Sequence, residues 1–386
     1  MSFIITLLAA VFVFSAVIAI HEFGHFAVAK LCGVQVNEFS IGMGPVLLKK
    51  MHHGTQYSLR ALPVGGFVAL EGEESPESQQ AEGEERSDLE ERPLSQRSGA
   101  DSSPNRGASK EEELSQPTGK PLNEAPVWQR ALIMAAGACM NFLLGFVVMA
   151  IVLTAQNEPI TSRVIYAVED GALCGQTGLE AGDKVLAVNG RRCFVANDML
   201  YELMRTEDYS ASFTVLRDGK KVELPRVQFD TWQDEDGETH MSLGFTVYGI
   251  RKTPVNVIKE AWNSVLYYGR IIFTSLMDLL RGRESINDLS GPVGIVTAIG
   301  QAASYGWQDL LELLALITVN VGIFNLLPFP ALDGGKVVFL LIEGVTGHAV
   351  PEKIQSGLTL AAFALLFALM IFATYNDIVR LVTGAI

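Results

Sequence analysis

The chain has 386 residues, 49% of them hydrophobic, and its 29 basic and 43 acidic side chains give a formal net charge of −14. This acidic balance argues against a nucleic-acid-binding protein, which presents a basic face to phosphates. The mean hydropathy of +0.26 is high for a soluble protein with so many carboxylates, which favours a chain with membrane segments.

The first long apolar run covers residues 3–20 and contains no charged side chain. A helix needs about 20 such residues to cross the hydrocarbon core of a bilayer. No basic residue precedes the run, and no small-residue cleavage site precedes the polar residues that end it. The run therefore predicts a transmembrane helix within residues 1–30 rather than a cleaved signal peptide.

Five residues close this run, His21-Glu22-Phe23-Gly24-His25. Positions i and i+4 share one face of a helix, so both imidazoles can reach a single metal ion. The carboxylate after the first histidine matches the H-E-x-x-H pattern, in which the histidines bind zinc and the glutamate acts as general base. A solvated helix end is the alternative, but ionisable groups are costly inside a membrane.

Glycines and prolines punctuate residues 31–72, and short stretches of β-forming residues lie between them. This pattern predicts β-hairpins. The lysines at 30, 49 and 50 indicate a cytoplasmic loop, so the first helix runs from outside to inside. A hairpin without a catalytic role is the alternative, and the residues do not choose between the two.

Residues 73–126 contain hardly any apolar side chains and are rich in Glu, Ser, Gln, Pro and Gly. Such a segment cannot bury enough surface to offset the entropy lost on ordering. We predict a disordered acidic linker on the cytoplasmic side. A regulatory tail is the alternative, but no residue pattern supplies a mechanism for it.

The second apolar run predicts a span over residues 127–156, from inside to outside, because Trp128 and Arg130 suit the inner interface. Its small residues, Gly137 among them, allow another helix to approach closely. Asn141 is a polar group at membrane depth. It is either an interhelical hydrogen-bonding group, which we favour, or a site residue.

Residues 159–230 carry the patterns of a compact β-rich module. Asn-Gly at 189–190 and Asp-Gly at 218–219 predict tight turns between strands, and 196–206 has helical apolar spacing. The sequence Gly-Leu-Glu-Ala-Gly-Asp at 178–183 resembles a PDZ domain, whose groove takes an extended peptide. A steric plug without peptide affinity is the alternative.

Residues 231–306 predict an extracytoplasmic or interfacial amphipathic region. An acidic loop comes first. The segment 253–282 then combines helical amphipathicity with aromatic residues suited to the membrane interface. It carries too many charged residues for an easy span.

A third span is predicted over residues 307–345, and a fourth over 355–383 returns the chain to the outside. The third is interrupted by prolines and by polar residues that include Asn325 and Asp333. Irregular backbone at membrane depth is tolerated where protein buries it or where it lines a cavity. We therefore expect the helix to unwind around residues 325–335 and to direct Asp333 at a cation.

Three candidate metal ligands result from this reasoning, His21, His25 and Asp333. Catalytic zinc takes three protein ligands and keeps one position open for water or substrate. The three residues complete that count, and Glu22 is the candidate catalytic base. A turn at the cytoplasmic edge is the alternative for Asp333.

Three features together resemble the bacterial site-2 protease family of the RseP/RasP type. They are H-E-F-G-H at 21–25, N-L-L-P-F-P-A-L-D-G-G at 325–335, and the PDZ-like module between the second and third spans. The resemblance covers the chain except for the acidic linker. One departure is that the family's second span usually carries G-P-x-x-N, whereas residues 137–141 read Gly-Ala-Cys-Met-Asn.

The resemblance implies an α-helical polytopic membrane protein with about four transmembrane helices, an inserted extracytoplasmic PDZ domain and a membrane-associated β-hairpin segment. It implies Zn²⁺ as cofactor. It also assigns substrate binding to Asn325, to Asn141, and to the segment 57–70 with Gly65 and Gly66, which would pair with an unwound substrate helix.

The implied function is an intramembrane zinc metalloendopeptidase of the cytoplasmic (inner) membrane, with both termini and the PDZ domain outside. Its substrates would be single-span membrane proteins such as anti-sigma factors or remnant signal peptides, first trimmed by an upstream site-1 protease. One alternative is a membrane binding protein or chaperone acting through its PDZ domain. Another is a metal transporter, which would be expected to show paired repeats and several polar spans.

Overall fold

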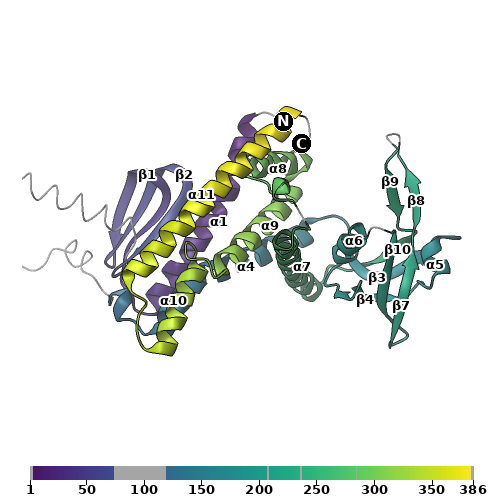
Figure 1. Cartoon of the computed structure of the whole chain (residues 1–386), viewed down its shortest axis with the longest axis horizontal. Helices are drawn as coiled ribbons and strands as arrows, with labels where there is room; N and C mark the ends of the chain where they lie inside the picture. The colour runs from purple at the N-terminus through teal and green to yellow at the C-terminus, as the bar shows by residue number, and fades with distance from the viewer. Residues whose placement is uncertain (1–2, 74–118, 207, 235–236, 284, 384–386) are drawn as a thin grey trace, which may run out of the picture. The chain divides into compact units, whose positions relative to one another are not determined.

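The computed structural model describes residues 3–73, 119–206, 208–234, 237–283 and 285–383 (Figure 1). Residues 74–118 of the predicted acidic linker (73–126) lie outside the described residues. The end of that segment differs from the predicted disorder, because it contains the 3₁₀ helix Leu122–Glu124 and buries Leu122 and Ala125. Two compact units emerge from the contacts within the chain. The first comprises Met1–Leu144, Asn287–Tyr305 and Val321–Ile386, and the second comprises Gly145–Ile286 and Gly306–Asn320.

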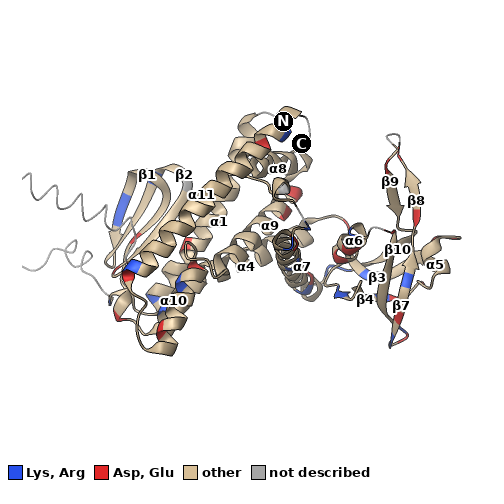
Figure 2. Ribbon diagram, in the orientation of Figure 1, with Lys and Arg blue, Asp and Glu red and all other residues tan. Residues whose placement is uncertain are grey.

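Within the described part of the chain, four helices are long and apolar enough to cross a membrane, in keeping with the number of spans expected from sequence. They are α1 (Phe3–Leu31), α4 (Val127–Ala155), α9 (Trp307–Leu326) and α11 (Glu352–Thr383). The charged residues of α11 lie near its two ends (Figure 2). The chain is therefore a polytopic helical membrane protein with additional β-sheet regions, as predicted at this level.

The segment predicted as one span over 307–345 consists of two helices. Helix α9 ends at Leu326, and α10 (Asp333–Thr346) begins at Asp333. The predicted unwinding is confined to residues 327–332. Two of these residues are prolines, which cannot donate a backbone hydrogen bond and do not continue a helix. The first helical residue after the break is the candidate metal ligand.

Two glycines make the start of α10 possible. A Cβ on Gly334 or Gly335 would overlap the backbone carbonyl oxygens of Leu327 and Phe329, respectively. Only glycine lets the new helix begin so close to the preceding turn. The glycine pair therefore fixes where Asp333 stands.

Helix α8 (Pro292–Tyr305) packs against α1 and α11. The fully buried carboxylate of Asp377, on α11, accepts backbone hydrogen bonds from Gly291 (3.2 Å) and Gly294 (2.8 Å). This satisfies donors at the start of α8. The sequence treated 231–306 as one extracytoplasmic or interfacial region. In the structure, its last part belongs to the unit that contains α1.

Two long bent strands, β1 (Val36–His52) and β2 (Thr55–Leu70), form the sheet of the first unit. The second half of β1 pairs with the first half of β2, from Val46↔Arg60 to His52↔Thr55. The first half of β1 lies between both halves of β2, because Ile41 pairs with Leu59 and with Gly66. Four half-strands thus lie side by side, and the half around Gly66 is at one edge.

A small apolar core joins this sheet to two of the apolar helices. It contains Ala29, Val34, Val36, Leu70, Leu122, Ala125, Ile133 and Met134. Some of these residues lie at the end of α1 and others near the start of α4 or in the short 3₁₀ helix η2 (Leu122–Glu124). Burial of these side chains holds the ends of α1 and α4 together beside the sheet.

The sheet of the second unit has the strand order β10-β3-β4-β6-β7, with β5 beside β4. Its elements are β3 (Ile160–Val168), α5 (Leu173–Gln176), β4 (Lys184–Val188), β5 (Arg191–Arg192), α6 (Ala196–Met204), β6 (Ser210–Arg217), β7 (Lys220–Gln228) and β10 (Phe245–Ile250). The predicted Asn-Gly and Asp-Gly turns have positive φ at all four residues, as the tight hairpin turn requires.

Strand β10 extends this module beyond the predicted boundary at residue 230. It pairs with β3 from Phe245↔Val168 to Ile250↔Ile160, and Phe245 is buried in the module's core. A separate hairpin of β8 (Asp230–Gln233) and β9 (Thr239–Ser242) precedes it. Short, glycine-containing β10 gives a weak strand pattern, and only its pairing with β3 reveals it.

Helix α7 (Pro254–Leu280) is held to α6 by buried ion pairs. Arg270 of α7 pairs with Asp198 and, at 3.6 Å, with Glu202. Arg205, next to the end of α6, pairs with Asp278 of α7. The three carboxylates are buried, so each has its counter-charge supplied from the facing element. The chain then continues through the 3₁₀ helix η3 (Ile286–Asp288).

Candidate metal centre

Helix α1 presents His21 and His25 on one face, one turn apart, as their spacing predicts. Both side chains are buried, with 8% of each residue exposed. Their Nε2 atoms lie 3.2 Å apart, and their rings are edge to face with centroids 4.8 Å apart. Two imidazole nitrogens thus face the same point.

Asp333, the first residue of α10, completes a triangle of donor atoms. Its Oδ2 lies 3.0 Å from Nε2 of His21 and 3.3 Å from Nε2 of His25. Zinc binds nitrogen and carboxylate oxygen at about 2.0–2.2 Å, so two ligands in a tetrahedron lie about 3.3 Å apart. The buried Oδ2 has no hydrogen-bond partner among the described residues. The spacing and the donor types fit a zinc ion.

Contacts behind the imidazoles set their orientation. Nδ1 of His25 lies 2.8 Å from the carbonyl oxygen of Ile133, to which it donates its proton, so Nε2 keeps its lone pair. Nδ1 of His21 lies 3.2 Å from the side-chain nitrogen Nδ2 of Asn141, a fully buried residue of α4. An amide can turn its oxygen toward an Nδ1 proton. Asn141 is therefore an interhelical hydrogen-bonding residue whose partner is a candidate ligand.

Helix α4 approaches the histidines through glycine. A Cβ on Gly137 would overlap Nε2 of His25 and would lie 2.6 Å from Cε1 of His21. A Cβ on Gly24 of α1 would lie 2.5 Å from the carbonyl oxygen of Ala136. Two helices in the membrane can come this close only where a side chain is missing. The small residues noted in the second span thus bring α4 into direct contact with the imidazoles.

Glu22 lies next to the histidines on α1 and is partly buried. Strand β2 passes beside it, since a Cβ on Gly66 would be 3.8 Å from Cγ of Glu22 and 2.7 Å from the carbonyl oxygen of Ser40. Gly65 has φ +93° and faces Met43 instead. Of the two predicted glycines, Gly66 is the one that lies at the candidate base.

Comparison with known proteins gives an independent view of the same chain. The sequence profile described as Peptidase family M50 matches residues 9–369. The chain belongs to peptidase family M50. The family resemblance read from the histidine and aspartate motifs is confirmed.

Curated relatives of this M50 peptidase match over almost the whole chain. The chain is 28% identical over 421 residues to the regulator of sigma-W protease RasP of Bacillus subtilis, covering 98% of this chain and 99% of that protein. It is 30% identical over 418 residues to the zinc metalloprotease RasP of Geobacillus kaustophilus, covering 97% of each. It is 30% identical over 421 residues to the RasP of Shouchella clausii, covering 97% of this chain and 99% of that protein.

The predictions of a zinc metallopeptidase of the site-2 type, and of Zn²⁺ as its cofactor, are confirmed by this family membership. The metal-transporter alternative loses its support, because the histidine and aspartate motifs of this chain lie within the match to a peptidase family. The other alternative is a binding protein with a degenerate site. A measurement of peptidase activity would distinguish it from an active enzyme.

The M50 peptidase carries Asn325 on the last turn of α9. Among the described residues, no hydrogen bond joins Asn325 to the two histidines or to Asp333. The same helix contacts α4 near Asn141, since a Cβ on Gly322 would lie 3.4 Å from Cβ of Asn141. The substrate-binding role of Asn325 stays a prediction.

One charged pair near the centre was not predicted. Lys336 follows Asp333 by three residues on α10, and its Nζ lies 2.7 Å from Oε1 of Glu73. Glu73 is the first residue of the predicted acidic linker. The i, i+3 spacing from Asp333 was the available signal, because it places Lys336 on the same helix face as the ligand.

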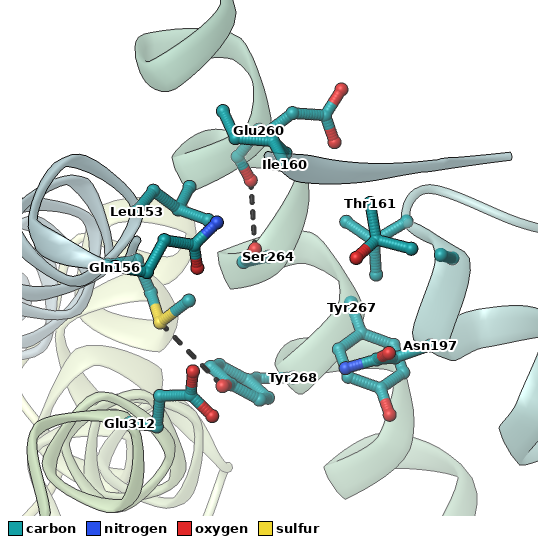
Figure 3. Close-up of a pocket in the computed structure, with 13 residues that line it drawn as sticks. Leu153, Gln156, Ile160, Thr161, Asn197, Glu260, Ser264, Tyr267, Tyr268 and Glu312 are labelled. Atoms are coloured by element: carbon teal, nitrogen blue, oxygen red, sulfur yellow. Dashed lines mark hydrogen bonds between the residues drawn. The ribbon is translucent and has the colours of Figure 1, made fainter. Parts of the chain in front are cut away.

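Two other features of the described residues are separate from this centre. Asp234, Glu238 and His240 form a second cluster of possible ligands on the exposed β8–β9 hairpin, where His240 pairs with Asp234 at 2.7 Å. The second unit also contains a pocket of about 150 Å³, lined by residues that include Tyr267 and Tyr268 (Figure 3). No predicted site residue lines that pocket.

Proposed function

We propose that this M50 peptidase hydrolyses a peptide bond within or near the transmembrane segment of single-span membrane proteins. The observation that carries the proposal is the convergence of His21, His25 and Asp333 within a set of apolar helices, with Glu22 adjacent. Ionisable residues at membrane depth are costly and are kept where they serve a site. The arrangement supports hydrolysis at the level of the bilayer.

His21 and His25 would hold the zinc ion through Nε2, and Asp333 would hold it through Oδ2. Bound zinc supplies Lewis acidity, which lowers the pKa of water and polarises a peptide carbonyl. Nδ1 of His25 donates its proton to the Ile133 carbonyl, and Nδ1 of His21 faces the side-chain amide nitrogen of Asn141. The first contact leaves Nε2 of His25 available to the metal, and the second holds the His21 ring in its orientation.

Glu22 would act as the catalytic base. Its carboxylate oxygen takes a proton from the attacking water and later delivers it to the nitrogen of the leaving amine. A Cβ on Gly66 would lie 3.8 Å from Cγ of Glu22, so strand β2 passes the proposed base within van der Waals distance. Asn325 is proposed to hold the substrate strand or to polarise its carbonyl.

A helical substrate hides its carbonyls in its own hydrogen bonds, so hydrolysis requires local unwinding. The half of β2 around Gly66 is an edge of its sheet and passes Glu22. Adding an extended peptide to such an edge is a known mode of recognition. We therefore assign the segment 57–70, with Gly65 and Gly66, the task of holding the substrate extended.

The module from Ile160 to Ile250 is proposed to be an extracytoplasmic PDZ domain that excludes substrates with a large outer domain. Both termini would then lie outside the inner membrane, and the substrate would first be cut by another protease. The name of one relative, regulator of sigma-W protease, supports an anti-sigma factor as substrate. A remnant signal peptide is the other substrate class in this proposal.

The test is cleavage of a single-span substrate, trimmed on its outer side, by purified full-length protein in detergent. Wild type is compared with Glu22→Gln and with Glu352→Gln, an exposed control at the start of α11. Zinc is measured on all three. We expect zinc on each protein and cleavage by wild type and the control alone. Equal cleavage by Glu22→Gln would remove the base assignment, and no cleavage by any protein would favour the binding-protein alternative.

A further inference from the structure

A groove in the β-rich unit is lined by residues of β3, β4 and β10 and by the start of α7. Ile165 and Val185 are buried in the core. Val164 and Lys184, which precede these two residues, line a groove of about 510 Å³ together with Tyr248 of β10. Side chains alternate between faces along a strand, so this groove is separate from the packed interior.

The groove is basic. Lys184, Arg251 and Lys259 line it, and no ion pair engages any of the three among the described residues. The guanidinium of Arg163, also in the lining, donates a hydrogen bond to a backbone carbonyl. Glu260 is the one carboxylate among the lining residues, and 9% of it is exposed. The groove thus presents three available cations against one carboxylate.

An apolar stripe runs along α7 beside the groove. Large apolar side chains recur on one face of this helix and are 37–72% exposed: Val255, Ile258, Trp262, Leu266, Phe273 and Leu280. They are separated by three, four, four, seven and seven residues, spacings that keep to one line along a helix. A helix with a narrow exposed apolar face and adjacent basic groups is typical of a membrane interface.

Lys259 links the two features. It follows Val255 by four residues and precedes Trp262 by three, so it shares the face of the apolar stripe. It also lines the groove. A lysine can lay its methylene stem along apolar surface and hold its ammonium group at the polar boundary. Lys259 can therefore contact acyl chains with its stem and a headgroup with its charge.

We propose that this groove binds the phosphate headgroup of an anionic phospholipid while the apolar stripe of α7 rests in the boundary between headgroups and acyl chains. An acidic peptide would satisfy the cations but would leave the stripe uncovered. A lipid covers both, and the chain is a membrane protein. Because α7 is bound to α6 through Arg270 and Asp198, this contact would hold the β-rich module at the bilayer surface. The inference does not depend on peptidase activity.

The test compares lipid binding to full-length proteins in detergent by native mass spectrometry. The groove variant is Lys184→Gln/Arg251→Gln/Lys259→Gln. The control variant, Lys220→Gln/Lys221→Gln/Arg226→Gln, removes the same charge from exposed residues of β7 outside the groove. Each protein is titrated with phosphatidylglycerol and with phosphatidylcholine. Each basic residue near an anionic surface strengthens binding about fivefold, so we expect at least a tenfold loss for phosphatidylglycerol in the groove variant.

Phosphatidylcholine binding should be the same in all three proteins, and the control variant should bind phosphatidylglycerol like wild type. Equal weakening in both variants would show a general charge effect and overturn the proposal. Wild-type binding by the groove variant, with an unchanged unfolding temperature, would also overturn it. A labelled hexaglutamate peptide serves as a competing probe. If the groove variant loses this peptide but keeps phosphatidylglycerol, the ligand is an acidic peptide and the lipid assignment is wrong.

Discussion

Buried carboxylates occur in two regions of this M50 peptidase, and their partners differ. Between α6 and α7, Asp198 and Asp278 face the guanidinium groups of Arg270 and Arg205. At the candidate metal centre, Asp333 faces two imidazoles, and its buried Oδ2 has no hydrogen-bond partner among the described residues. A buried charge needs a counter-charge. In the first region the chain supplies it, and in the second the geometry leaves that place for a metal ion.

The comparison teaches how to separate structural from functional buried charge. Removing one partner of an internal pair leaves an uncompensated charge and destabilises the fold. Removing a metal ligand abolishes metal binding and activity, while the polypeptide around it loses little. The two regions should therefore respond to substitution in opposite ways, in activity and in stability.

The substitution Asp333→Ala is expected to have the largest effect, on both zinc binding and cleavage. Loss of one of three ligands should bring bound zinc well below one ion per protein and cleavage below detection. The apo forms of wild type and variant should unfold at temperatures within a few degrees of each other. Zinc content, cleavage of a trimmed substrate and thermal unfolding after chelation measure this. A variant with full zinc would exclude Asp333 as a ligand.

Glu22→Gln separates metal binding from catalysis. General-base catalysis contributes roughly 10²- to 10⁴-fold, so the rate constant for cleavage should fall by that amount. Zinc content should stay at the wild-type value because Glu22 is not among the three converging donor residues. Single-turnover cleavage with metal analysis checks both values, and a fall in both together would make Glu22 a ligand.

Arg270→Ala tests the other region. It leaves Asp198 and Glu202 buried without this counter-charge, and breaking a buried pair costs about 3–5 kcal/mol. Arg226→Ala on the exposed surface of β7 is the control. The measurement is the free energy of unfolding of the β-rich unit by denaturant. Zinc content should not change, and equal stability in both variants would show that the pair is solvated.

Asn141→Ala should act on the metal indirectly. The amide contacts Nδ1 of His21 and makes no contact that places it among the donor atoms. Loss of such a supporting contact typically weakens metal binding about 10- to 100-fold. Competition with a zinc chelator gives the affinity. Asn141→Gln, which keeps the amide, should recover part of it, and wild-type affinity in Asn141→Ala would contradict the orienting role.

The smallest effect concerns pH and the internal pairs. The hydrogen bond from Arg205 lowers the pKa of the Asp278 carboxyl. A lowered folded-state pKa adds stability that is present above the ordinary aspartate pKa of about 3.9 and is lost as the pH falls toward the lowered value. The unfolding temperature of wild type should therefore decline on acidification below about pH 5. Asp278→Asn should decline less, and equal slopes would contradict the assignment.

Much of the candidate site could be predicted from sequence because the residue patterns that indicate it are local. The i, i+4 spacing of His21 and His25 fixes their common face, and the prolines before Asp333 end a helix wherever they occur. The Asn-Gly and Asp-Gly turns were equally local. The unpredicted features were pairings between distant segments. Strand β10 can be recognised only from its pairing with β3. The role of Lys336 can be recognised only from its ion pair with Glu73.

The sequence by itself determined the apolar spans, the donor types and the helix break that precedes Asp333, because length, composition and short-range spacing dictate them. Tertiary structure alone decided that Asp333 lies 3.0 Å from His21, that Gly137 admits α4 to the imidazoles, and that Gly66 passes beside Glu22. These are contacts between segments far apart in the chain. Their distances depend on how closely packed helices and strands approach one another, and no local pattern of residues encodes that.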